Sequence, residues 1–202
     1  RFGSIGCISK TKEYLQIMSQ IIQYFQNGTW ATVLVFIVLS LYLIATLWAF
    51  LYRYFYLSSW SNREKESIER LTSGRKYISE FSILSRCHNH DEEISINSLN
   101  ACLKAAEKDA TSGLTLLSIV ASTSPFVGLF GTVVSILDSF AKIGVAGGAS
   151  LNVLAPAISE ALIATACGIF VAVPAYAFHL ALKRKCYVIL SYIQMQIELL
   201  KS

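Results

Sequence analysis

A single carboxylate, Glu160, lies inside a long apolar run that contains no lysine or arginine. Placing an acidic residue at membrane depth costs about 2.5–3.5 kcal/mol on insertion scales, and such residues usually mark paths for protons or ions. Two hydroxyl-bearing residues accompany it: Thr165 in the same run, and Thr132 in the apolar run before it. We therefore predict a proton or ion pathway built from Glu160, Thr132 and Thr165.

The depths of these three residues can be estimated if the two runs form antiparallel helices. At 1.5 Å per residue, Thr132 lies about 8 Å and Glu160 about 9 Å from the outer ends of their helices. Thr165 lies about 16 Å deep on the same estimate, level with Pro125. Glu160 and Thr165 point about 140° apart on a helix, so they cannot both face one narrow axis. The estimate predicts a polar column, with Thr165 deeper than the other two residues.

Small residues are frequent in both runs and indicate close helix packing or a polar lining. Ala164 and Gly168 follow Glu160 on the same helical face, and Ser122 adds a hydroxyl in the earlier run. We predict that Ser122, Ala164 and Gly168 line a lumen wide enough to receive another helix. Pro125 and Pro174 lack a backbone donor, so we expect a kink at each.

Other groups that could support chemistry are weaker candidates. Cys87, His88, His90 and Asp91 cluster in the sequence, but their spacing matches no common metal site, and we expect no metal or cofactor. The five cysteines form no CxxC pair, and we expect no disulfide framework. An intramembrane hydrolase would need a second carboxylate or a Ser–His pair at matching depth, so we do not expect an enzyme.

The elements that must position these residues are membrane helices. The chain is 54% hydrophobic and 15% charged, a composition typical of integral membrane proteins. We predict an all-α membrane protein with three transmembrane helices, at residues 29–57, 113–138 and 154–182, since each run is long enough to cross a bilayer. The first is bulky and aromatic and suits lipid, whereas the second and third carry the small residues that suit an interior.

The remaining segments are polar or amphipathic. Residues 1–28 are predicted to form an amphipathic helix, either on the membrane surface or packed on the protein. Residues 58–112 are predicted to form a helical hairpin with charge pairs at helical spacing along 63–70 and a break near 85–92. A turn is expected at 139–153. The tail, 183–202, is expected to be an amphipathic helix that serves as a bundle seam or an oligomer contact.

Basic residues assign the two sides of the membrane. They follow the first span, beginning at Arg53, and form the cluster 183–185 after the third, whereas 139–153 carries only Lys142. By the positive-inside rule, the hairpin and the C-terminus are cytoplasmic, and the N-terminus and the 139–153 turn are periplasmic. The net charge of +4 forms no basic stripe, so we expect no nucleic-acid partner.

Two segments, 123–134 and 158–175, resemble the ExbB/TolQ family of bacterial inner-membrane proton-channel subunits, which is related to the flagellar stator protein MotA. The matching motifs are SPFVGLFGTV and SEALIATACG, and the channel positions of the family fall on Thr132, Glu160 and Thr165. The chain departs from the family at Val134-Ser135, where Trp-Gly is usual, and at His179-Leu180, where Tyr-Asn is usual.

The resemblance implies a ring-shaped homo-oligomer, a pentamer, in the lipid of the inner membrane. The ring would enclose a single-span partner similar to ExbD or TolR, whose aspartate takes the proton. A TonB-like or TolA-like protein would carry the work to outer-membrane transport or to the Tol-Pal envelope system. Sodium, as in stator relatives, is the other ion to consider. The alternatives are a passive scaffold that holds a partner helix and a MotA-like flagellar stator subunit.

Overall fold

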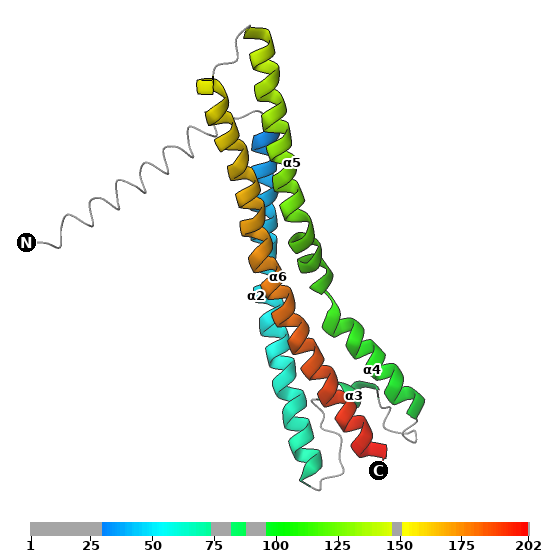
Figure 1. Cartoon of the computed structure of the whole chain (residues 1–202). Helices are drawn as coiled ribbons and strands as arrows, with labels where there is room; N and C mark the ends of the chain where they lie inside the picture. Colours follow the sequence, from blue (N-terminus) through cyan, green and yellow to red (C-terminus); the bar gives the residue numbers. More distant parts are fainter. Residues whose placement is uncertain (1–29, 74–81, 88–95, 147–150, 202) are drawn as a thin grey trace, which may run out of the picture. The chain divides into compact units, whose positions relative to one another are not determined.

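The computed structural model describes residues 30–73, 82–87, 96–146 and 151–201, which form five helices (Figure 1). These are α2 (Trp30–Thr72), α3 (Ile83–Cys87), α4 (Ile96–Thr111), α5 (Leu114–Ala146) and α6 (Leu151–Lys201). The predicted all-α architecture is confirmed. The amphipathic helix predicted for 1–28 lies outside the described residues.

Three helical stretches are long and apolar enough to cross a membrane, as predicted: Thr32–Thr72, Asn97–Lys142 and Ala161–Leu199. Two of the predicted spans continue without a break into helical extensions, since α2 reaches Thr72 and α6 reaches Lys201. Leucine, glutamate, lysine and arginine, which are good helix formers, recur in both extensions and favour continued helix there. The chain is therefore a multi-pass membrane protein with long helical extensions.

The break between α4 and α5 is built by Gly113, whose φ of 83° is the left-handed conformation that glycine adopts most readily. The side chain of Arg53 supports this break, because its Nη2 donates to the carbonyl oxygens of Asp109 and Ala110 at 2.7 Å each. A cation at the C-terminal end of a helix is favoured by the helix dipole. The boundary predicted between residues 112 and 113 falls at this break.

The turn between the second and third spans is shorter than predicted. Helix α5 continues past residue 138 to Ala146, and α6 begins at Leu151. Asp138 and Lys142 form an ion pair of 2.7 Å at i,i+4 spacing, which supports the additional helical turns. Most of the 139–153 segment is therefore helix.

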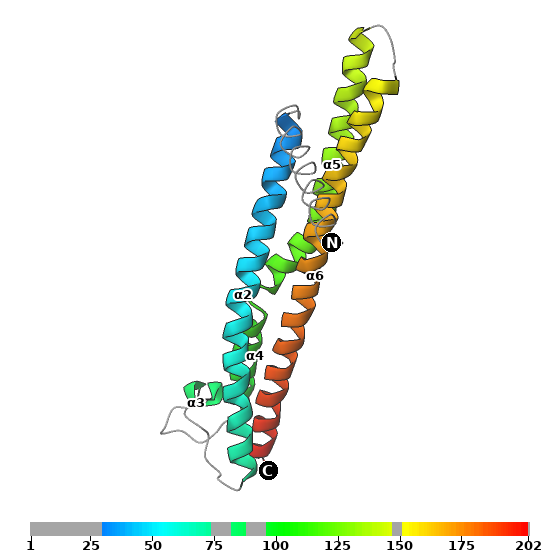
Figure 2. The same ribbon diagram turned by 90° about the vertical axis from the view of Figure 1, so that its left-hand side faces the viewer.

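The chain divides into two compact units. Among the described residues, the first unit contains 30–42, 123–146 and 151–171, and the second contains 43–73, 82–87, 96–122 and 172–201. Within the first unit, α5 and α6 run side by side in both views (Figures 1 and 2). Within the second, α2 and α6 run side by side (Figure 2).

The second unit has an apolar core, in which α6 contributes mainly large aliphatic side chains and α4 mainly small ones. One face of α4 contributes Leu99, Cys102, Ala106 and Ala110, and the end of α6 contributes Leu182, Cys186, Ile189, Ile193 and Ile197. Both sets recur every three or four residues, as expected for the buried stripe of an amphipathic helix. The predicted amphipathic tail therefore packs as a bundle seam inside its own chain.

A buried carboxylate, Glu64, connects three segments of the second unit. Its Oε1 accepts hydrogen bonds from Trp60 Nε1 and from the Ile83 backbone N–H, both at 3.0 Å, and its Oε2 accepts from Gln196 Nε2 at 2.8 Å. Ser82 Oγ lies 3.0 Å from Glu64 Oε2 and 2.8 Å from Gln196 Oε1. The charge pairing predicted along 63–70 is wrong for Glu64, since this side chain is 0% exposed and its described donors are neutral.

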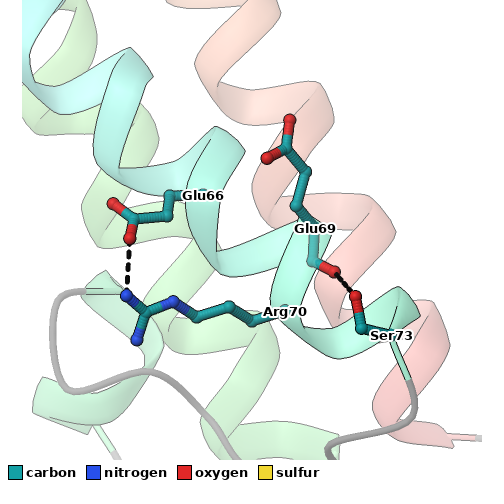
Figure 3. A pocket seen from close by; sticks show the side chains of 4 residues that line it. All are labelled: Glu66, Glu69, Arg70 and Ser73. Atoms are coloured by element: carbon teal, nitrogen blue, oxygen red, sulfur yellow. Dashed lines mark hydrogen bonds and ion pairs between the residues drawn. The ribbon is translucent and has the colours of Figure 1, made fainter.

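Exposed charge pairs do occur on the last turns of α2, where they were predicted. Arg70 pairs with Glu66, and Lys65 lies 3.8 Å from Glu69. Figure 3 shows the guanidinium of Arg70 directed at Glu66, while Ser73 Oγ donates to the Glu69 carbonyl at 2.7 Å. All four paired side chains are at least half exposed, so these pairs contribute little to stability.

Cysteine chemistry differs from the sequence expectation at one position. Cys102 is disulfide-bonded, although the spacing of the cysteines indicated no framework. Spacing cannot reveal which cysteines a fold brings together. Cys186 is free and buried, and its Sγ donates to the Ala110 carbonyl at 3.0 Å.

Candidate functional site

The hydroxyl of Thr132 lies between α5 and α6. Its Oγ1 is 3.0 Å from the carbonyl oxygen of Ala161 on α6 and 3.3 Å from that of Gly128 on its own helix. It also contacts the hydroxyl of Thr165. A threonine in a membrane helix commonly bonds only to the carbonyl four residues earlier. Here the shorter of the two carbonyl contacts is the one that reaches the other helix.

The single hydroxyl proton of Thr132 indicates the direction of the hydrogen bonds in this cluster. Thr132 has one hydroxyl proton, and donating it to the Ala161 carbonyl leaves its lone pairs free to accept from Thr165. The result is a chain that runs from Thr165 through Thr132 to the Ala161 carbonyl. Because Ala161 directly follows Glu160, the chain ends on the helical turn that carries the lone carboxylate.

The backbones of α5 and α6 approach closely next to these hydroxyls. A Cβ added to Gly128 would lie 2.7 Å from the Ala164 carbonyl oxygen and 3.1 Å from the Gly168 Cα. A Cβ added to Gly168 would lie 2.6 Å from the Ser124 carbonyl oxygen. Only glycine fits these two positions without a shift of backbone. Thr132 therefore makes its interhelical contact where the backbones of α5 and α6 approach closely.

The predicted register of the two helices is wrong in one respect. Thr165 is level with Thr132, whereas the depth estimate placed it deeper, level with Pro125. The estimate counted from residues 138 and 154, but α5 continues to Ala146 and α6 begins at Leu151. The carbonyl bonded to Thr132 belongs to Ala161, the residue after Glu160, and the predicted level of Glu160 itself remains a prediction.

Some predicted groups cannot be placed. Glu160 lies on α6, but its side chain lies outside the part that the structure describes. The same holds for the Cys87 side chain and for His88, His90 and Asp91. Within the described residues, no group of three His, Cys, Asp or Glu side chains is arranged to hold a metal ion.

The residues predicted to line a pore differ in their surroundings. Ala164 and Gly168 are buried in the first unit and contact α5. Ser122 belongs to the second unit, where its exposed hydroxyl is bonded to its own helix, 2.9 Å from the Ser118 carbonyl. A lining role for these residues remains a prediction.

The two predicted kinks also remain predictions. Pro125 lies inside α5 and Pro174 inside α6, and both helices continue through their proline.

Two participants in the crossing were not identified from the sequence as site residues. Gly128 makes the closest backbone approach, and the buried Ser124 hydroxyl has no hydrogen-bond partner among the described residues. The signal was available in the spacing, since Ser124, Gly128 and Thr132 recur every four residues and therefore share a helical face.

The arrangement is suited to handling a proton and offers little for covalent chemistry. A hydroxyl can accept and donate a hydrogen bond at the same time, so two hydroxyls in contact can pass or orient a proton. A nucleophile would need a base within hydrogen-bond reach, and the described partners of Thr132 are a hydroxyl and two carbonyl oxygens.

Comparison with known proteins agrees with this chemistry. Residues 65–195 match the MotA/TolQ/ExbB proton channel family. The chain is 43% identical over 187 residues to an ExbB-like biopolymer transport protein of Helicobacter pylori, an alignment that covers 92% of this chain and 99% of the relative. It is 48% identical over 83 residues to the biopolymer transport protein ExbB of Xanthomonas campestris, covering 39% of this chain and 33% of the relative. It is 38% identical over 125 residues to the Tol-Pal system protein TolQ of Pseudomonas aeruginosa, covering 59% of this chain and 53% of the relative. Three long apolar helices, a hydroxyl chain next to a lone carboxylate and these relatives together place the chain in the MotA/TolQ/ExbB proton channel family.

Proposed function

We propose that this chain is the channel subunit of an inner-membrane motor driven by the proton motive force. Glu160 takes up and releases the proton, and the hydroxyls of Thr132 and Thr165 orient or pass it. One unit charge that crosses 100 mV releases about 2.3 kcal/mol, so several protons are needed for each mechanical step.

The observation that carries this proposal is the hydrogen-bond chain from Thr165 through Thr132 to the Ala161 carbonyl. It lies within helices apolar enough to span a membrane, and it ends one residue from the lone acidic group of the third span. Hydroxyls in such a setting have no bulk water to satisfy them, so they bond to each other and to the backbone, and this supports a role for them in orienting a proton next to Glu160.

The working form in this proposal is a ring-shaped homo-oligomer, a pentamer, that encloses a single-span partner similar to ExbD or TolR. The exposed apolar side chains of the first unit support assembly within the membrane, for example Phe126 at 69% and Phe170 at 71% exposure. Side chains of this kind are covered by lipid or by neighbouring subunits. The acidic group of the partner helix would then be the titratable group that faces Glu160, whose own apolar run contains no other acidic residue and no lysine or arginine.

The orientation follows from the charges. Exposed Lys183 and Arg184 follow the third span, so we propose that the C-terminus and the 58–112 segment are cytoplasmic and the N-terminus is periplasmic. The orientation can be tested by labelling single cysteines in intact cells with an impermeant maleimide. Reaction of Arg184→Cys from outside would contradict the proposed orientation.

Two pathways can use such a motor. The relative that aligns along nearly its whole length is ExbB-like, which supports outer-membrane transport with a TonB-like protein as the first choice. Purification in mild detergent, followed by identification of co-purifying single-span proteins, tests this choice. An ExbD-like partner supports it, and a TolR-like partner would assign the chain to envelope maintenance.

The functional test uses two substitutions that keep side-chain size. Glu160→Gln and Thr132→Val are expected to abolish proton-driven transport while the oligomer still assembles. Glu107→Gln and Thr115→Val are matched controls, because both residues are exposed and lie outside the hydroxyl chain. Normal transport in both test variants would reject the motor and favour a passive scaffold that only holds a partner helix.

A further inference from the structure

The hydroxyl chain depends on how closely α5 and α6 approach each other. The Thr132 hydroxyl must reach a carbonyl and a hydroxyl on the opposite helix, with 3.0 Å to the Ala161 carbonyl. A threonine side chain is short, so a hydrogen bond of this length between two helices requires an unusually small distance between their axes. Whatever sets that distance controls whether the chain can form.

Two glycines, one on each helix, set the distance. The position of a Cβ on Gly128 lies 2.7 Å from the Ala164 carbonyl oxygen, and that of a Cβ on Gly168 lies 2.6 Å from the Ser124 carbonyl oxygen. Real Cβ atoms do not approach other atoms so closely, and the obstructing atoms are backbone. A side-chain rotation therefore cannot relieve the contact, and the helices themselves would have to separate.

A third glycine at the same crossing has a different environment. A Cβ on Gly131 would meet methyl carbons only, at 3.1 and 3.4 Å on Val35 and 3.2 Å on Ala164. The Val35 methyls can yield by a few tenths of an ångström, and the contact of 3.2 Å with the Ala164 Cβ is less severe than the contacts of 2.6–2.7 Å with backbone oxygens at Gly128 and Gly168. Gly131 lies next to Thr132 on the same helix, so it provides a matched control for the loss of a glycine from α5.

We infer that Gly128 and Gly168 are positioning residues for the proton path. They hold α5 and α6 close enough for Thr132, Thr165 and the Ala161 carbonyl to remain bonded. The consequence of this inference, a change in proton flow, rests on the proposed function. Its geometric part, the contact between positions 132 and 165, can be tested without any assumption about function.

The geometric test is disulfide trapping. Thr132→Cys and Thr165→Cys are introduced together with Cys167→Ala, and the cross-linked peptide is identified by mass spectrometry after oxidation. Cysteines whose Cβ atoms lie about 4 Å apart form a disulfide readily. We expect trapping to become at least about tenfold slower when Gly128→Ala or Gly168→Ala is added, and to change less than about twofold with Gly131→Ala. Trapping at the parental rate in both test variants would overturn the inference.

The functional test places the same glycine substitutions in the chain with its native threonines. Proton flux per assembled complex is measured in proteoliposomes, together with the amount of partner bound per oligomer. A positioning role predicts at least a tenfold loss of flux with partner binding unchanged, whereas a merely structural role would lower both together. Using one variant on each helix keeps the test valid if either one accumulates poorly.

The outcomes separate the two claims. Slow trapping with lost flux supports the positioning role. Slow trapping with normal flux overturns that role, although the glycines would still set the crossing. If Thr132→Val and Glu160→Gln both leave transport intact, the proposed function fails, and the trapping result still decides whether the two glycines hold the helices together.

Discussion

The two units of the chain are held together in opposite ways. In the first unit, small residues bring backbones into contact, and the closest approaches involve Gly128 and Gly168. In the second, large aliphatic side chains fill a core, and a buried carboxylate joins its segments through neutral donors. An added methyl group is the damaging change in the first unit, and a removed side chain is the damaging change in the second.

The difference corresponds to the role that we propose for each unit. A proton path needs precise distances between polar groups, and backbone contacts between glycines fix a distance more rigidly than flexible side chains do. A helical extension outside the apolar spans can use the hydrophobic effect, whereas lipid offers no such driving force between membrane helices. The two kinds of packing are therefore expected to respond differently to substitution.

The largest loss of stability is expected for Ile193→Ala in the second unit. Ile193 is fully buried among the core residues of α6, and truncation of such a side chain costs about 3 kcal/mol through lost burial and a new cavity. Thermal unfolding in detergent measures the change. The control is Met195→Ala two residues later, where the side chain is 43% exposed. Equal shifts for both variants would show that the second unit does not rely on this core.

A slightly smaller effect is expected for Glu64→Ala. The substitution leaves the Trp60 Nε1 and the Ile83 N–H without their acceptor and leaves Gln196 Nε2 only its 3.4 Å contact with the backbone carbonyl of residue 64, and buried unsatisfied groups cost about 1–3 kcal/mol. The midpoint of thermal unfolding should fall clearly. Glu66→Ala removes a carboxylate two residues away whose pair with Arg70 is exposed, and it should change the midpoint little. The account of the buried cluster fails if the two variants are alike.

A smaller loss of stability is expected for Arg53→Met, which keeps an unbranched side chain but removes the guanidinium that caps α4. Two hydrogen bonds to the carbonyls of Asp109 and Ala110 are lost, together with a favourable charge at the helix end. We expect a loss of about 1–2 kcal/mol in the free energy of unfolding. Arg184→Met serves as the exposed control. Full stability of Arg53→Met would mean that Gly113 alone fixes the break.

The smallest effect is expected in the first unit, for Ser124→Ala. The Ser124 hydroxyl is buried and has no hydrogen-bond partner among the described residues, so its removal breaks no described bond. The free energy of unfolding should stay the same or rise by up to about 1 kcal/mol. A clear decrease, measured by the same thermal unfolding, would reveal a partner for this hydroxyl in the assembled membrane complex.

Much of the fold could be predicted from the sequence because membrane spans are long and apolar. Three spans, the helical extensions and the boundary at residue 112 all follow from run length and charge. The length of the turn after the second span could not be predicted from hydropathy. Apolarity declines near residue 138, but the Asp138–Lys142 pair supports further helical turns, and α5 continues through Gly144 to Ala146.

The contact between two of the proposed site residues was not predicted from the sequence. Thr132 and Thr165 could be selected by chemistry alone, yet their direct contact depends on where the helices begin and end. The sequence does not distinguish Gly128 from the other small residues of the run. Only the structure, where α5 and α6 cross, shows that a Cβ on Gly128 would collide with the backbone of α6. Glu64 was assigned to a charge pair for a similar reason: charge spacing on one helix does not reveal a segment that packs over it.

The most direct test of the central claim is proton flux through the purified complex in proteoliposomes under an imposed proton gradient. The account predicts that Thr132→Val and Glu160→Gln each reduce the flux to background while Thr115→Val retains it, with equal oligomer and partner content in all samples. Undiminished flux in both Thr132→Val and Glu160→Gln would contradict the account.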